Sequence, residues 1–149
     1  FGLYFSAAPL GYMLGNSLSR SFGPRWGLDR AAVIGSFFSL AGISVLLAVA
    51  LAGLATKPAI SALLFCYGLA NGLIVANSLV GAIRAAGPHS GAATGLCGAL
   101  QMACSAGLGS LVIWLGGDTD FPLAVGICWV MTAVGLLCGF AVIRRRADD

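Results

Sequence analysis

The chain has 149 residues, of which 59% are hydrophobic and only 9% are charged. Soluble domains carry about 25% charged residues, and eight Lys and Arg with five Asp and Glu are too few to keep a core of this size dissolved. This composition excludes a soluble globular protein and predicts an integral membrane protein. The net charge of +3 therefore says little about the fold; its use is to indicate the orientation of the chain in the membrane.

Charged residues and Pro- or Gly-bearing breaks divide the sequence into five apolar runs. Each run is close to the roughly 20 helical residues that cross a bilayer core, whereas the strands of a membrane barrel would be about half as long and half polar. We therefore predict an all-α integral membrane fold with five transmembrane helices, at about 1–20, 31–55, 59–83, 91–115 and 122–143. Several breaks end in residues typical of helix N-caps or first turns: Asp29, Thr56, Pro58, Ser90, Asp120 and Pro122.

Positive charge alternates between the breaks. Lys and Arg of short loops stay on the cytoplasmic side, and most of them fall in the first break, the third break and the tail: Arg20, Arg25, Arg30, Arg84 and Arg144 to Arg146, with His89 nearby. We expect the N-terminus outside and the C-terminus in the cytoplasm of a bacterial inner membrane. The basic tail after an apolar span is typical of a membrane anchor, not of a nucleic-acid site.

The first residues predict that this chain is a fragment. Phe1 is not Met, and FGLYFSAAPLGYMLG lacks the basic start of a signal peptide. The chain begins in the middle of an apolar helix, so we expect a longer polypeptide, although cleavage of a leader or an arbitrary cut would leave the same start.

Polar side chains are unevenly distributed over the predicted helices. Amides are costly in lipid and collect at bundle interiors or cavities, and the second and fifth predicted helices contain none. We expect those two helices to be peripheral and lipid-facing, and the other three to form an inner wall. The intramembrane polar residues of the inner three are Tyr4, Tyr12 and Asn16, then Tyr67, Asn71, Asn77 and Ser78, then Thr94, Gln101 and Ser105.

The third predicted helix carries two amides on different faces. Asn71 and Ser78 are seven residues apart and share a face, whereas Asn77 is displaced from Asn71 by about a third of a turn. One amide can therefore face a cavity while the other faces a neighbouring helix. The alternative is that all of them join helices, at about 0.6 to 2 kcal/mol per hydrogen bond. Three pairs of glycines four residues apart predict close helix packing: Gly11 and Gly15, Gly68 and Gly72, Gly91 and Gly95.

Several kinds of site have no signature in the sequence. The five cysteines lie in apolar runs without a CxxC pair, so we expect them to be packing residues rather than metal ligands. Apart from the ends, the spans hold no Asp, Glu, Lys or Arg, and there is no catalytic or phosphate-binding motif. We expect neither an enzyme nor a bound cofactor or metal.

The segment GNSLSRSFGPRWGLDRAAVIG resembles a signature of the major facilitator superfamily, through the spacing of Gly15, Arg20, Arg25, Gly27, Arg30 and Gly35. It is similar to the copy in the second half of those transporters, without the aspartate of the first-half copy. FGLYF, YGLANGLIVAN and GAATGLCGALQM resemble the bicyclomycin-resistance (Bcr/CflA) branch of the drug:proton antiporters.

The resemblance implies that residues 1–149 form part of a C-terminal six-helix bundle, helices eight to twelve of twelve. It implies a central cavity lined by Tyr12, Asn71, Ser78 and Gln101, with Asn77 contacting a neighbouring helix and Arg20 and Arg25 in a cytoplasmic gating loop. The implied partners are a small amphipathic drug, the lipid bilayer, a proton gradient and the missing N-terminal half. The alternatives are a metabolite transporter of the same superfamily, a self-contained five-helix membrane scaffold and, with no visible filter motif, a channel.

Overall fold

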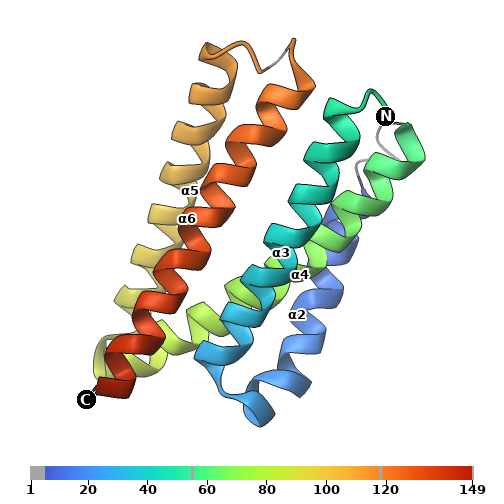
Figure 1. Ribbon diagram of the computed structural model, residues 1–149. Helices are drawn as coiled ribbons and strands as arrows, with labels where there is room; N and C mark the ends of the chain where they lie inside the picture. The colour runs from blue at the N-terminus through green and yellow to red at the C-terminus, as the bar shows by residue number, and fades with distance from the viewer. Residues whose placement is uncertain (1–5, 55, 118, 149) are drawn as a thin grey trace.

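The computed structural model describes residues 6–54, 56–117 and 119–148, and all regular structure in these ranges is helical (Figure 1). This confirms the predicted all-α fold; the predicted cavity-side residue Tyr4 lies outside the described residues. The α-helices are α2 (Ala7–Trp26), α3 (Leu28–Leu51), α4 (Lys57–Ala86), α5 (Ser90–Trp114) and α6 (Phe121–Asp148), and the 3₁₀ turn η1 (Gly87–His89) joins α4 to α5.

Three described segments are long and apolar enough to cross a membrane: Leu28–Leu51, Lys57–Trp114 and Phe121–Val142. The middle segment has 58 residues, which as one straight helix would measure about 87 Å against a hydrocarbon core of about 30 Å. The chain instead turns at Gly87, whose φ of 52° suits glycine. A multi-pass membrane protein follows from these lengths. As described, α2 is not among the three segments.

The first predicted loop, residues 21–30, is helical almost throughout. α2 continues to Trp26 and α3 begins at Leu28, so Gly27, with a φ of 82°, forms the whole connection. The prediction that Arg20 and Arg25 lie in a cytoplasmic loop is therefore wrong, because both lie in α2. Arginine is a good helix former. A charged residue therefore indicates where a helix leaves the lipid, but the helix itself can continue beyond that residue.

α3 and α4 form the centre of the bundle. α2 packs along α4, while α3 packs against both α4 and α6. Ile43, Leu46 and Val125 form a buried cluster between α3 and α6. The expectation that the second predicted helix is peripheral and lipid-facing is wrong, because α3 buries seven residues, including Ser36 and Ser39. Small side chains such as serine let neighbouring helices approach closely. A helix can therefore lie at the centre of a bundle without carrying Asn or Gln.

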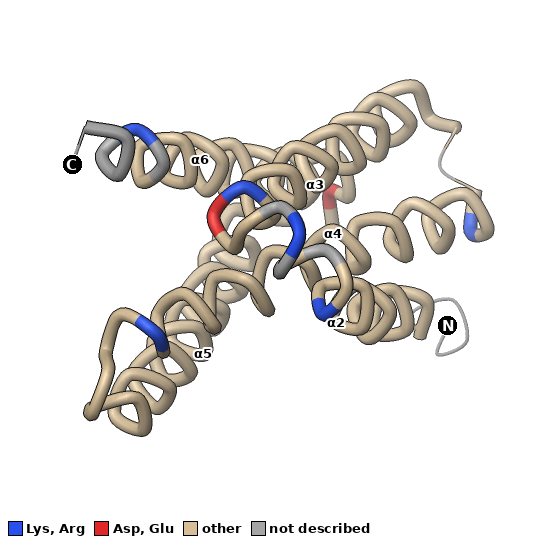
Figure 2. The backbone as a smooth tube through the Cα atoms, turned by 90° about the horizontal axis from the view of Figure 1, so that it is seen from below, with Lys and Arg blue, Asp and Glu red and all other residues tan. Residues whose placement is uncertain are grey.

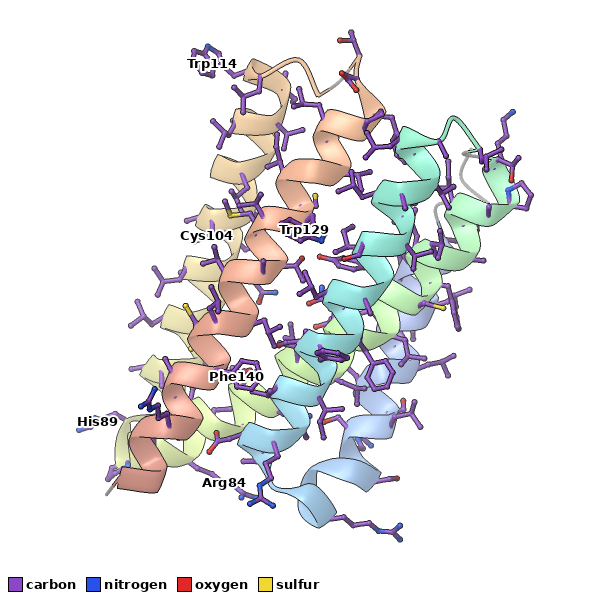
Figure 3. All side chains as sticks on the ribbon, viewed as in Figure 1. Arg84, His89, Cys104, Trp114, Trp129 and Phe140 are labelled. Atoms are coloured by element: carbon purple, nitrogen blue, oxygen red, sulfur yellow. The ribbon has the colours of Figure 1, made fainter. Side chains whose placement is uncertain are left out.

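α6 is fastened to α3 by a side-chain hydrogen bond. The Trp129 indole Nε1 donates to the Ser44 hydroxyl at 2.7 Å, and that hydroxyl donates in turn to the Leu40 carbonyl at 2.7 Å. Figure 3 labels Trp129 and also Trp114, which is 81% exposed at the end of α5.

We expect Trp129→Phe to lower the free energy of unfolding by about 0.6 to 2 kcal/mol, since one interhelical hydrogen bond is lost while most ring contacts stay. Unfolding in mixed micelles with increasing dodecyl sulfate, followed by circular dichroism, measures the change. Trp114→Phe is the matched control, with no expected change. Equal effects of the two substitutions would contradict a stabilising role for the Ser44 bond.

α5 stands apart from the rest of the bundle. None of its residues is buried, and its packing partners are α4 and η1. Figure 1 draws α5 next to α6, but Figure 2, from below, shows that their lower ends lie well apart. The prediction that this helix forms an inner wall with the first and third predicted helices is therefore not met by the described residues. Its polar residues Thr94, Gln101 and Ser105 are exposed.

The two ends of the bundle differ in charge. Arg84 and His89 lie at the lower end, and Trp114 lies at the opposite end (Figure 3). The lower end also holds the α2–α3 connection (Figure 1), beside Arg25 and Arg30. At the upper end, the Leu123 N–H donates to the Asp120 carboxylate at 3.2 Å, so Asp120 caps the start of α6.

Candidate functional site

The contact between α2 and α4 orients α4 in the bundle. A Cβ added to Gly11 would overlap the Phe65 carbonyl oxygen, and one added to Gly15 would overlap that of Leu69. Gly68 and Gly72 approach α2 in the same way, against the carbonyl oxygens of Ala8 and Tyr12. The two backbones therefore touch over about two turns, and α2 covers one face of α4 at this level.

The third predicted glycine pair does not pack. Apart from the neighbouring residues and backbone of its own helix, no described heavy atom lies within 4 Å of a Cβ built on Gly91 or Gly95. The packing predicted for these two glycines is therefore absent from the described part of the chain, because α5 leaves the bundle after η1.

Asn77 belongs to the packed side of α4. It is 2% exposed, its side-chain Nδ2 donates to the Leu73 carbonyl at 2.7 Å, and a Cβ on Gly23 of α2 would lie 2.7 Å from its Oδ1. The Asn77 amide group therefore has a hydrogen-bond partner within its own helix. Its side chain also fills the space next to Gly23, which has no side chain.

Asn71 lies on a different face of α4 and lines a cavity of about 320 Å³ between α3, α4, α5 and α6. Two polar lining residues bond within their own helices: Ser36 donates to Ala32 at 2.9 Å and Thr132 donates to Cys128 at 2.8 Å. The side chains of Asn71 and Ser39 form no hydrogen bond with any described residue. Their donors and acceptors are therefore available to a molecule in the cavity.

Ser78 lines a second cavity of about 410 Å³, which shares Ser36, Ile74 and Gly135 with the first. We call the two adjoining cavities the α4 groove; from α4 it is lined by Tyr67, Asn71, Ile74, Ser78, Gly81, Ala82 and Ala85. The groove runs between α3, α4 and α6, and Leu108 and Val112 of α5 close its upper part.

Four polar residues of this groove were not predicted from the sequence. Ser36, Ser39 and Thr132 belong to the helices predicted to be peripheral, and Asp29, expected only as an N-cap, lines the lower cavity from the first turn of α3. Serine and threonine are tolerated in any membrane helix by bonding back to it. The presence and spacing of serine and threonine in these helices therefore do not predict a cavity.

The other two predicted cavity residues lie elsewhere. Tyr12 lines a third cavity, of about 530 Å³, between α2 and α4. Gln101 is exposed on α5 and lines none of the four described cavities. It is seven residues from Leu108 and shares its face, but it lies where α5 has diverged from α6. The structure thus brings together Asn71 and Ser78 and separates them from Tyr12 and Gln101.

No protein-family model, curated protein or solved structure matches the chain. The upper cavity combines an unpaired amide and an unpaired hydroxyl with an apolar wall and has no charged lining residue. Such a surface can bind an amphipathic molecule by shape and a few hydrogen bonds. Among the described residues, no group of three or more His, Cys, Asp or Glu could hold a metal ion.

Proposed function

We propose that the chain is part of a secondary active transporter of the major facilitator superfamily, a multidrug drug:proton antiporter that works by alternating access. The α4 groove is then part of its substrate cavity, and Asn71 and Ser39 contact the substrate. The observation that carries the proposal is that these two polar groups are unpaired in an apolar bundle, facing a cavity. Polar residues inside membranes are rare and face cavities or partners, so an unpaired amide favours a ligand.

The residue assignments follow the resemblance as far as the geometry supports it. Asn71 and Ser78 contact substrate from α4, and Ser39 contacts it from α3. In this proposal the five helices are helices eight to twelve, and the N-terminal half of the same polypeptide supplies the facing wall and the proton-carrying carboxylate. Secondary transporters hold substrate between such repeats near the bilayer midplane.

The test is transport by the complete reading frame that contains this chain, expressed in bacteria lacking their main drug pumps. We expect Asn71→Ala to reduce drug tolerance and dye efflux about two- to tenfold, the effect of one lost hydrogen bond of roughly 0.5–1.5 kcal/mol. Membrane abundance, measured by immunoblot, should not change. The control is Gln101→Ala, which changes an exposed amide outside the described cavities and should leave tolerance unchanged.

The native cysteines provide a second readout. Cys128 lines the upper cavity together with Asn71, whereas Cys104 is exposed on α5 (Figure 3). A transported drug should slow maleimide labelling of Cys128 and not that of Cys104. If Asn71→Ala behaves like the parent across a drug panel and no drug protects Cys128, the groove is not the substrate cavity.

The exposure of α5 favours one alternative, a membrane scaffold. Leu96, Leu100 and Trp114 are all more than half exposed, and a partner protein could cover them. A scaffold has no need for Asn71, so Asn71→Ala would be silent while substitutions on α5 would release the partner. A metabolite transporter of the same superfamily would instead show Cys128 protection by a metabolite and no drug phenotype.

A further inference from the structure

The third cavity differs from the α4 groove in charge. It lies on the other side of α4, between α2 and α4, and has a volume of about 530 Å³. Arg20 of α2 and Arg84 of α4 both line it, and no Asp or Glu is among its lining residues. Neither arginine forms an ion pair with any residue that the structure describes. Two exposed arginines therefore line one cavity that has no acidic residue in its lining.

The same cavity offers neutral hydrogen-bonding groups. Tyr12, Asn16 and Ser19 of α2 line it, and none of them forms a side-chain hydrogen bond with a described residue. Asn77 lines it from α4 but already bonds to Leu73. Arginine matches phosphate oxygens in a bidentate geometry, and hydroxyl and amide groups complete such a site. The lining thus has the chemistry of a phosphate-binding site.

The position of the cavity points to the source of the phosphate. Arg84 lies in the last turn of α4, at the end of the bundle that carries His89 (Figure 3), while the helix bodies are apolar enough to lie in lipid. Arginines at that level meet the headgroup region. Basic cavities between membrane helices on the cytoplasmic side bind anionic headgroups.

We propose that the cavity between α2 and α4 binds the phosphodiester of an anionic phospholipid, held by Arg20 and Arg84. The inference does not depend on transport, because it concerns another cavity on another face of α4. A lipid seated there bridges α2 and α4 at the end of the bundle below their glycine contact.

The test uses the purified full chain with phosphatidylglycerol, measured by native mass spectrometry as lipid retained per protein. Near an anionic surface each arginine contributes enough to change binding roughly fivefold, so Arg20→Gln with Arg84→Gln should lower phosphatidylglycerol affinity about 30-fold. Phosphatidylcholine has the same phosphodiester but no net charge, so its retention should fall much less in the variant than that of phosphatidylglycerol. Arg25→Gln is the matched control: Arg25 is exposed in the same helix but lines none of the described cavities, and its substitution should have little effect.

Each contrary outcome overturns the proposal. If Arg25→Gln reduces retention as much as the double substitution, the attraction is unspecific. If inorganic phosphate binds in an arginine-dependent manner and phosphatidylglycerol does not, the ligand is a soluble anion. If the double glutamine variant does not fold, Arg20→Lys with Arg84→Lys keeps the charge and loses the bidentate geometry. It should still weaken phosphatidylglycerol binding several-fold, and unchanged binding would refute the site.

Discussion

Gly15→Val should separate α2 from α4 and give the largest loss of stability of any single substitution considered. The new side chain meets the Leu69 carbonyl and the Gly72 Cα, which are backbone atoms and cannot rotate away. Overpacking a tight contact costs about 1–3 kcal/mol even where side chains can adjust, so we expect a loss of at least that size. Unfolding by dodecyl sulfate, monitored by circular dichroism, should begin at a lower detergent fraction.

The matched control is Gly95→Val. It places the same side chain in a membrane helix, at a position with no described atom within 4 Å, and should leave the unfolding midpoint nearly unchanged. The comparison removes the intrinsic effect of valine on a helix. If both variants unfold at the same detergent fraction, the α2–α4 contact does not stabilise the bundle.

Gly23→Ala should destabilise the parent and stabilise a variant that lacks the Asn77 side chain. In the parent, the new methyl group would lie 2.7 Å from Asn77 Oδ1, which is held by a buried amide bonded to Leu73. We expect a loss of about 1–3 kcal/mol. In an Asn77→Ala background the obstacle is gone, and alanine should gain about 0.5–1 kcal/mol over glycine within a helix.

A double-mutant cycle measures this reversal of sign. The four chains, parent, two single variants and the double variant, are unfolded under identical conditions, and the interaction energy between positions 23 and 77 is obtained by difference. Gly126→Ala, in α6 with open space around its Cα, supplies the gain that alanine gives without an obstacle. Additive effects at Gly23 and Asn77 would show that the two residues do not touch.

The helical class could be predicted from the sequence, because the cost of exposing backbone groups to lipid leaves few other structures. The different surroundings of Asn71 and Asn77 also follow from helical periodicity once α2 has occupied one face of α4. The residues at which the helices begin and end were less predictable. α2 continues through Arg20 and Arg25 because arginine is compatible with a helix, even where its charge indicates the end of a membrane span.

The positions of Asn and Gln in the sequence did not predict which helices lie at the centre of the bundle. Ser36 and Ser39 allow α3 to reach the centre of the bundle, and serines of this kind are equally common on surfaces that face lipid. Gln101 has the polarity of a cavity residue and the helical phase of Leu108, but α5 diverges from the bundle at its level. That divergence follows the Gly87–His89 turn, and helical periodicity within α5 does not predict it.

The pairing of α2 with α4 has a consequence for the order in which the bundle can be assembled during synthesis. α2 and α3 are synthesised before α4, yet their direct contact is small compared with that between α2 and α4. The partner surface of α2, at Gly68 and Gly72, is made 57 residues after Gly11 and Gly15, respectively. Within this chain, α2 therefore cannot form its main contact until α4 has been synthesised. Among the described helices, we expect the first stable tertiary unit to contain α2, α3 and α4 rather than the α2–α3 pair alone.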